Sequence, residues 1–346
     1  MKSFPLTGLR AMAPTDVPDA RIEQPTDVLV RMGAVGVCGS DIHYYTTGRI
    51  GSQVVEYPFT VGHECAGTVE QVGSQVTQVR PGDRVAIEPA MHCGHCDQCL
   101  RGRPNTCRSI RFLGCPGQAE GSMSEFLVMS EENCFKLPDE ISLEAATISE
   151  PLAIGIYAVE QSRLAAGDKI GILGMGPIGR TVLLPALRHG CAASYATDKI
   201  DERCVAAKSA GATWVGNPLQ QDIVAAIEEL EPLGLDIVFE CCGQQEAIDQ
   251  ALQLLRPGGT LMLIGIPEVD RVSFAAETMR RREISIINVR RQRGCVEKAL
   301  QFIGKNRADV EQLITHRFPF SDSRAAFDLV ADYREGVVKA MIDFTA

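Results

Sequence analysis

The chain has 346 residues, about twice the length of a typical domain, and its 45% hydrophobic and 23% charged residues exclude an intrinsically disordered protein. Its 34 lysines and arginines against 44 acidic residues give a net charge of -10, which disfavours nucleic acid as a partner. No apolar run reaches the roughly 18 residues that span a membrane, and Met1 to Arg10 lack the apolar stretch of a signal peptide, so we expect a cytoplasmic protein without membrane attachment.

Short strands are expected over residues 27–85. Runs of strand length alternate with glycine turns in DVLVRMGAVGVCG, TVGHECAGTVEQVG and PGDRVAIEP, and none carries the apolar spacing of a helix. This part of the sequence predicts an irregular all-β domain.

Four of the thirteen cysteines follow in a tight cluster, at Cys93, Cys96, Cys99 and Cys107. The odd total argues against a complete disulfide framework, whereas this spacing offers four thiolates to one tetrahedral ion and leaves no open position. The cluster predicts a structural zinc, with four buried free thiols as the alternative. Seven of the other nine cysteines are scattered after residue 95 outside this cluster and are expected to be small buried residues: Cys115, Cys134, Cys191, Cys204, Cys241, Cys242 and Cys295.

Strands and helices alternate after Pro151. Strands are expected at residues 169–174, 194–198, 235–240, 260–265 and 284–289, and helices at 177–189, 202–209 and 244–255. This alternation predicts βαβ units around a parallel sheet. In the C-terminal tail, THRFPF and VVKAMIDF predict two further strands around one helix.

Residues 174–179 read GMGPIG, which fits the G-x-G-x-x-G pattern between an expected strand and an expected helix. Such glycines allow a tight turn, close approach of a pyrophosphate and close helix packing, with the helix N-terminus facing the phosphates. A plain turn between strand and helix is the alternative. The candidate coenzyme-binding residues are Gly174, Gly176, Pro177, Ile178 and Gly179.

Asp198 ends the next expected strand, near the spacing at which an acid accepts from an adenosine ribose. Its charge would repel a 2'-phosphate, so NAD is expected rather than NADP. Lys199 and Arg203 lie close in the sequence and are further candidates for coenzyme contact; their charge leaves NADP as the alternative.

Cys38, His63, Glu64 and Glu150 form a more dispersed group. Each alone is more often a core residue than a ligand. Together with the cysteine cluster and the nucleotide motif, however, the sequence resembles the zinc-containing medium-chain dehydrogenase/reductase family over its whole length, most closely the polyol branch of sorbitol and xylitol dehydrogenases. The segments that carry the resemblance are VGVCGSDIHYY, VGHECAGTVEQVG, GDRVAIEP, CLRGRPNTC, KLPDEISLEAATISEPLAIGIYAV, GMGPIG and ITHRFPF.

The resemblance implies an α/β protein of two domains. Residues 1–152 and 289–346 would form a GroES-like irregular β catalytic domain, with a structural zinc lobe at about 90–110. Residues 153–288 would form a Rossmann domain, a doubly wound parallel sheet that binds NAD. A homodimer or homotetramer is expected.

The resemblance also implies the catalytic zinc site. Cys38 and His63 match zinc ligands, and Glu64 matches the third ligand of the polyol branch. Glu150 matches a carboxylate that holds the zinc-bound water or exchanges with Glu64. Asp41 matches the carboxylate that orients the zinc histidine.

Ser40 and His43 match a proton relay, and Tyr44 matches an aromatic residue that lines the substrate. In the coenzyme domain, Gly265 and Val289 are expected to contact NAD. An isolated hydroxyl bonded to its own turn, or a surface imidazole, would explain Ser40 and His43 without catalysis.

One catalytic zinc, one structural zinc and NAD predict a dehydrogenase that oxidises a polyol or sugar alcohol. Arg290 matches an arginine of the polyol branch, but Arg291 stands where an aromatic residue would be. Because arginine binds carboxylates, a sugar acid (aldonate) is the alternative substrate, and a solvated basic surface is the alternative role for both arginines. A zinc-free quinone reductase and a non-catalytic nucleotide-binding protein are further alternatives.

Overall fold

The computed structural model describes residues 1–345, which divide into two compact units. The first comprises Met1–Glu150 and the C-terminal segment from Val296, and the second is Pro151–Cys295. From the sequence, the chain was expected to pass from the first unit to the second after residue 152 and back after residue 288. In the structure these boundaries follow residues 150 and 295. Residues 289–295 pack with the second unit, where the Arg293 guanidinium carbon lies 5.9 Å from the centre of the Tyr157 ring.

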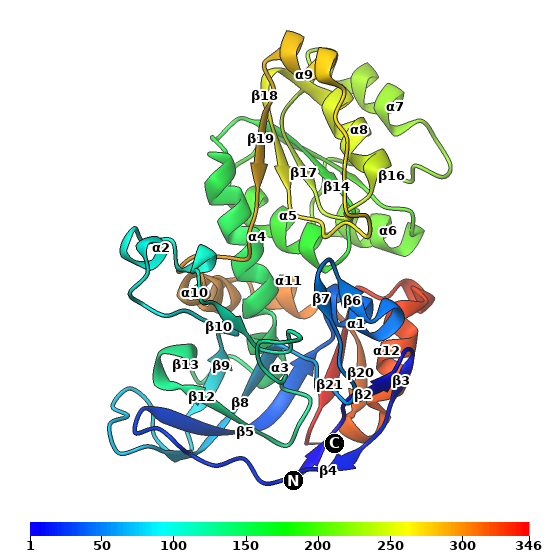
Figure 1. The fold of residues 1–346 in the computed structure, drawn as a ribbon. Helices are drawn as coiled ribbons and strands as arrows, with labels where there is room; N and C mark the ends of the chain where they lie inside the picture. The colour runs from blue at the N-terminus through cyan, green and yellow to red at the C-terminus, as the bar shows by residue number, and fades with distance from the viewer. Residues whose placement is uncertain (346) are drawn as a thin grey trace. The chain divides into compact units, whose positions relative to one another are not determined.

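A seven-stranded sheet forms the centre of the first unit (Figure 1). Its strand order is β13-β9-β8-β5-β21-β20, with β12 also paired to β5, and only β20 and β21 run parallel. The C-terminal strand β21 pairs with β5 so that Met341 lies opposite Gly36. The strands are β5 (Asp27–Gly36), β8 (Glu64–Val72), β9 (Arg84–Ile87), β12 (Phe126–Ser130), β13 (Cys134–Lys136), β20 (Ile314–Pro319) and β21 (Lys339–Asp343).

Short two-stranded sheets surround this central sheet. They contain β1 (Lys2–Ser3), β2 (Leu6–Gly8), β3 (Ala11–Met12), β4 (Thr15–Asp16), β6 (Arg49–Ile50), β7 (Gln53–Val54), β10 (Ala90–Met91) and β11 (Arg111–Phe112). The 3-10 turns are η1 (Pro104–Thr106), η2 (Glu131–Asn133), η3 (Phe320–Asp322) and η4 (Arg334–Gly336).

The first unit also contains helices. They are α1 (Gly39–Thr47), α2 (Asp97–Leu100), α3 (Leu143–Thr147), α10 (Val296–Lys305), α11 (Arg307–Glu311) and α12 (Ser323–Ala331). Of these, α1 lies within residues 27–85, where only strands were expected, and α12 is the helix expected between the two C-terminal strands. Helix α1 begins where the Asp41 carboxylate accepts the Cys38 amide, and it ends at Gly48 in the left-handed region, with φ of 71°. Local capping, rather than a continuous apolar stripe, therefore defines this helix.

A six-stranded parallel sheet forms the centre of the second unit, in the order β16-β15-β14-β17-β18-β19. In chain order this is 3-2-1-4-5-6, the arrangement of a Rossmann sheet. The strands are β14 (Lys169–Leu173), β15 (Ala193–Thr197), β16 (Trp214–Gly216), β17 (Leu235–Glu240), β18 (Leu255–Leu263) and β19 (Ser285–Asn288). The helices are α4 (Ser149–Ser162, which starts in the first unit), α5 (Pro177–His189), α6 (Asp201–Ser209), α7 (Ile223–Leu230), α8 (Gln245–Leu254) and α9 (Ala276–Arg282).

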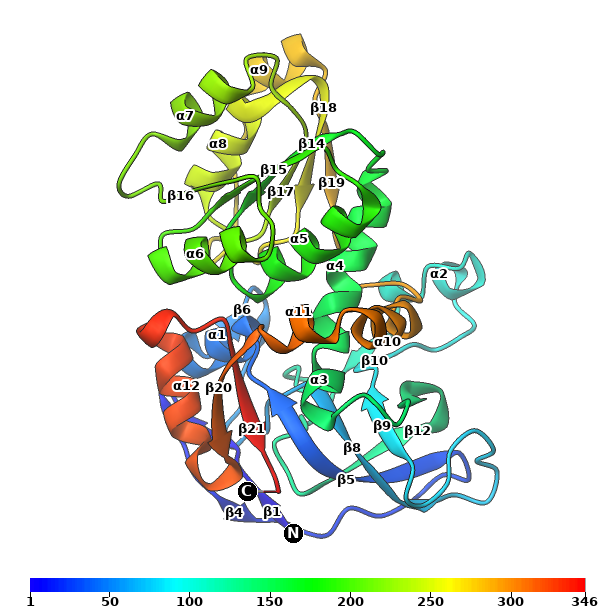
Figure 2. The same ribbon diagram turned by 180° about the vertical axis from the view of Figure 1, so that it is seen from behind.

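Alternating strand side chains give this sheet two apolar faces, each covered by helices (Figure 2). Ile170 and Ile172 pack with α4, α5 and α6, while Leu173 belongs to the cluster formed with α7 and α8. The expected helix at 177–189 coincides with α5, which continues through Pro185. In the part of the chain that the structure describes, no helix is long and apolar enough to cross a membrane.

Candidate functional site

The four clustered cysteines converge on one point. The Sγ–Sγ distances are 3.5 Å for Cys93–Cys107, 3.6 Å for Cys96–Cys99, 3.8 Å for Cys96–Cys107 and 4.0 Å for Cys93–Cys99. Four sulfurs around a zinc ion at about 2.3 Å are separated by about 3.8 Å in a tetrahedron. The geometry therefore fits a closed zinc site.

Backbone amides also point at these sulfurs. The Cys93 amide donates to Cys107 Sγ at 3.3 Å, and the Cys96 amide donates to Cys93 Sγ at 3.4 Å. The amides of Arg108 and Cys99 lower the pKa of the Cys96 thiol to about 6. Such donors favour thiolates, the form that binds metal.

A second donor group forms where α1 and β8 begin. One ligand atom each from Cys38, His63 and Glu64 lies within 4.8 Å of the others. His63 and Glu64 are buried, whereas Cys38 is half-buried. One thiolate, one imidazole and one carboxylate form a ligand set that zinc accepts, and three protein ligands leave a position for water or substrate. The donor chemistry thus fits a catalytic zinc.

Asp41 connects two segments of this group. Its carboxylate is fully buried and accepts the amides of Cys38 at 3.1 Å and Gly62 at 3.2 Å, and it lies 3.4 Å from His63 Nδ1. Burial lowers the pKa of His63, but the charges of Asp41 and Cys38 outweigh burial and raise it overall. With Nδ1 beside Asp41, the Nε2 atom of His63 is left for the metal.

The residues matched to the proton relay and the substrate lie on α1. Ser40 Oγ donates to Cys38 Sγ at 3.3 Å. His43 is one turn further along the helix and is half-buried, so the two side chains share a helix face. Tyr44 is buried, and its hydroxyl donates to Gln53 Oε1 at 3.3 Å.

Glu150 lies outside the three-residue donor group, at the start of α4. Burial raises the pKa of its carboxyl, and with the opposing effect of His63, the further rise from Glu64 and Glu88 and the lowering by Lys339, the pKa is about 8. Glu150 is therefore close enough to interact electrostatically with two of the donors.

Lys339 is a site residue that the sequence did not reveal. Its Nζ is buried and donates to both carboxylate oxygens of Glu64, at 2.7 and 2.5 Å, and to the Val37 carbonyl at 3.0 Å. The available signal was a single lysine inside the otherwise apolar segment VVKAMIDF, because a charged residue in a buried strand requires a partner.

The glycines of residues 174–179 form a close turn in the second unit. Gly174 has φ of 95°, and a Cβ on Gly179 would lie 1.9 Å from the Gly174 carbonyl oxygen. Gly176 precedes Pro177 and Ile178 in the first turn of α5. This turn leaves the first amides of α5 free of side-chain caps, which suits a bound pyrophosphate.

Asp198 follows β15 beside this turn. Its carboxylate accepts the Met175 amide at 2.7 Å and the Ile200 amide at 2.9 Å. The buried Arg203 guanidinium lies 3.8 Å from the same carboxylate, whereas the exposed Lys199 ammonium lies 3.3 Å from Glu246. Of the two cations, Arg203 is therefore the one beside the candidate ribose acceptor.

Gly265 and Val289 follow the carboxyl ends of β18 and β19. A Cβ on Gly265 would lie 2.1 Å from the Gly243 amide nitrogen, and the Val289 amide donates to the Leu263 carbonyl at 2.9 Å. Both therefore lie at the sheet edge that carries Gly174, where dinucleotides bind in such sheets.

The last residues singled out in the sequence are the arginines at 290–293 and the scattered cysteines. Arg290 and Arg293 are exposed and Arg291 is half-buried, all in the second unit. The expectation of buried scattered cysteines is wrong for Cys242, which is exposed, and for Cys191 and Cys241, which are half-buried. Cys241 and Cys242 follow β17 at the carboxyl end of the sheet.

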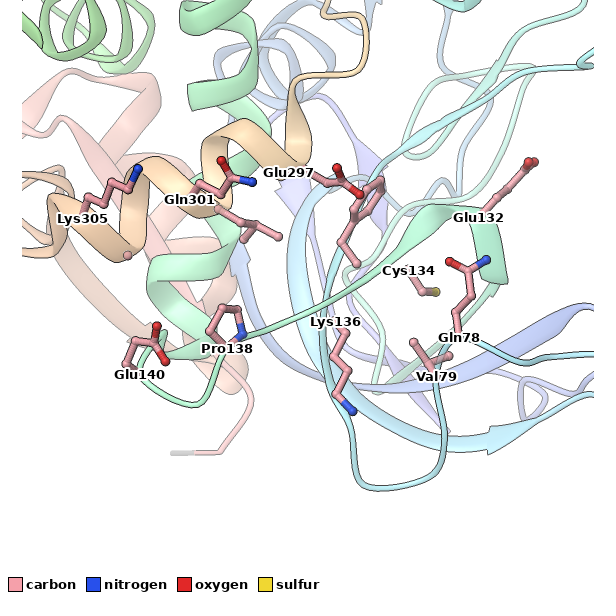
Figure 3. A pocket seen from close by; sticks show the side chains of 13 residues that line it. Gln78, Val79, Glu132, Cys134, Lys136, Pro138, Glu140, Glu297, Gln301 and Lys305 are labelled. Atoms are coloured by element: carbon pink, nitrogen blue, oxygen red, sulfur yellow. The ribbon is translucent and has the colours of Figure 1, made fainter.

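A cavity of about 610 Å³ in the first unit lies between β13 and α10. Figure 3 shows Glu297, Gln301 and Lys305 of α10 facing a wall that includes Cys134 and Lys136. None of the residues that line it is a zinc or nucleotide candidate, so this cavity is separate from the chemistry.

Two family models match the chain: the alcohol dehydrogenase GroES-like domain over residues 24–139 and the zinc-binding dehydrogenase model over residues 177–305. Sorbitol dehydrogenase of Bacillus subtilis is 36% identical over 330 residues, which cover 94% of this chain and 92% of that relative. The chain belongs to the zinc-binding dehydrogenase family. The resemblance, the two-domain α/β fold and the enzyme class expected from the sequence are confirmed.

Other proteins similar to this chain differ in the substrate or coenzyme that they are named for. L-idonate 5-dehydrogenase of Vitis vinifera is 37% identical over 314 residues, covering 89% of this chain and 85% of that relative. A zinc-binding dehydrogenase structure from Sinorhizobium meliloti, bound to NADP, is 27% identical with a TM-score of 0.90 and covers 99% of this chain and 98% of that one. The dehydrogenase is thus a zinc-dependent oxidoreductase of polyols or sugars that uses a nicotinamide dinucleotide.

Proposed function

We propose that this dehydrogenase oxidises a secondary alcohol of a vicinal polyol with NAD. The observation that carries the proposal is the convergence of Cys38, His63 and Glu64 within 4.8 Å. A site with one thiolate is harder than a site with two, and a harder site favours oxygen-rich substrates that bind through adjacent hydroxyls.

Cys38, His63 and Glu64 would hold the catalytic zinc, which supplies a Lewis acid for the substrate hydroxyl while NAD accepts the hydride. Ser40, next to Cys38, receives the hydroxyl proton, and the half-buried His43 passes it toward solvent. Asp41 keeps the His63 ring in the orientation that the metal requires. Glu150 binds the active-site water or replaces Glu64 as a ligand.

Tyr44 lines the substrate site, and its hydroxyl, which donates to the Gln53 side chain, remains able to accept a hydrogen bond. Arg290 and Arg291 are the residues we assign to substrate discrimination. A sugar acid is the second candidate substrate, supported by these arginines and by the L-idonate 5-dehydrogenase relative.

The test combines metal analysis with a substrate panel. We expect two zinc ions per chain, and a higher kcat/KM for sorbitol, xylitol and related polyols than for ethanol; gluconate and idonate test the second candidate. His63→Ala is expected to abolish turnover while one zinc per chain remains in the cysteine lobe. Ethanol outcompeting every polyol and every sugar acid, or a chain without zinc, would refute the proposal.

We further propose a homodimer or homotetramer in the cytoplasm. The resemblance to the polyol dehydrogenases supports the oligomer, and the thirteen free cysteines support a reducing compartment. Sedimentation of the purified protein and localisation of a tagged chain test these two statements.

A further inference from the structure

The buried pair of Lys339 and Glu64 joins three distant parts of the chain. Lys339 is the first residue of the C-terminal strand β21, and Glu64 is the first residue of β8. The third acceptor of the Lys339 ammonium is the carbonyl of Val37, the residue before Cys38. One cation therefore contacts one zinc-ligand candidate directly and the backbone beside another.

Every proton of this ammonium has an acceptor. An ammonium carries three N–H donors, and the structure gives Lys339 Nζ three acceptors, two of them on one carboxylate. Both residues are 1% exposed, so water does not screen the pair. The carboxylate of Glu64 is consequently held in one orientation with part of its charge balanced.

The neighbouring strand leaves room for this arrangement. Gly36 lies opposite Glu64 in the pairing of β5 with β8, and a Cβ there would lie 2.5 Å from Glu64 Oε2 and 3.4 Å from Lys339 Cδ. Because Gly36 has no side chain, the side chains of Glu64 and Lys339 have room to contact each other beside β5.

We propose that Lys339 is a positioning residue for the catalytic zinc site: by binding both oxygens of Glu64, it keeps this carboxylate a weak, exchangeable ligand. A carboxylate without that counter-charge, in the same dry surroundings, binds a divalent ion more strongly and with both oxygens. Lys339 thereby preserves the open metal position that the substrate needs. The inference rests on the proposed zinc site.

Cobalt substitution of the catalytic metal gives a readout that does not depend on turnover. Co2+ in a four-coordinate site shows strong visible absorption, and a fifth ligand atom weakens it. We expect Lys339→Met to reduce this absorption at least about twofold, and kcat to fall by a factor of ten or more while the cysteine lobe keeps its zinc. In a Glu64→Gln background, Lys339→Met should leave the spectrum unchanged, because the ligand through which it acts is neutral.

Lys169→Met is the matched control. Lys169 is also the first residue of a strand, β14, and also pairs with a glutamate, Glu231, but in the second unit. Its removal should leave the cobalt spectrum unchanged. Where Lys339→Met does not fold, Lys339→Gln keeps a donor and removes the charge, and the same spectral change is expected.

The outcomes separate this inference from the proposed function. Failure of the wild-type chain to bind Co2+ beside Cys38 overturns the proposed site. If Co2+ binds but neither Lys339 variant alters its spectrum, only the role of Lys339 is overturned. The same holds if the Lys339 variants alter the spectrum as much in the Glu64→Gln background as in the wild-type background.

Discussion

Asp41→Asn tests the assembly of the catalytic centre. The carboxylate of Asp41 accepts the half-buried amide of Cys38 and the buried amide of Gly62, and it lies beside His63 Nδ1. An amide side chain has one acceptor oxygen, so its NH2 group must face either a backbone N–H or the histidine ring. In every orientation at least one of these donors loses its acceptor.

The size of the effect follows from those contacts. An unsatisfied buried donor costs about 1–3 kcal/mol, which is the expected loss in the free energy of unfolding. If the NH2 group faces His63, the ring changes tautomer and Nε2 no longer presents a lone pair. Loss of such a supporting carboxylate lowers metal affinity about 10–100-fold, or about 1.4–2.7 kcal/mol.

Dialysis against a graded chelator, followed by zinc analysis and urea unfolding, measures both quantities. Asp328→Asn is the control, since Asp328 accepts from the Tyr45 hydroxyl at 2.7 Å in the same unit but touches no zinc candidate. It should lower stability and leave zinc affinity unchanged. Unchanged zinc affinity in Asp41→Asn would show that this carboxylate does not orient the ligand.

Three further predictions concern the lobe, the coenzyme and Glu150. Cys99→Ser should remove one zinc per chain and lower the Tm, because a closed site adds its binding energy to the fold; an unchanged Tm and zinc content would exclude a metal there. Asp198→Ala should reduce the preference for NAD over NADP in kcat/KM, and a wild-type enzyme that prefers NADP would contradict the assignment. Glu150→Gln should lower kcat/KM at least about tenfold, or about 1.4 kcal/mol. Near-normal turnover would show that Glu150 serves only as an acidic residue at a helix N-terminus.

Local patterns predicted the coenzyme unit well. Its strands and helices are contiguous in sequence, and the turn at residues 174–179 requires glycine for reasons that act within a few residues. The sequence analysis missed β16 and the helices α4, α7 and α9. Helix α7 did carry a local signal, because Asp222 caps its start and Ile223 and Ile227 are buried one turn apart. The tertiary sheet stabilises β16 through pairing with β15, which no local pattern reports.

The zinc site was predictable in part. Cys38, His63 and Glu64 came from a resemblance, and the structure brings them together. Lys339 was not found because it meets Glu64 across 275 positions of sequence. Contacts at such separation depend on which strands pair, and β21, at the C-terminal end of the chain, pairs with β5 near its start.

The first unit is formed by two stretches of chain that the second unit separates, and this affects how it folds during synthesis. The second unit is one continuous stretch, so it can fold while the ribosome is still making the rest of the chain. The first unit lacks β20 and β21 until synthesis ends, and at about 5–20 residues per second the counter-charge of Glu64 arrives about 14–55 s after Glu64 itself. During that interval the edge of β5 at residues 34–36 lacks its pairing strand, and Glu64 lacks its counter-charge. Because unpaired strand edges favour aggregation, we expect the nascent first unit to be more prone to it than the continuous second unit.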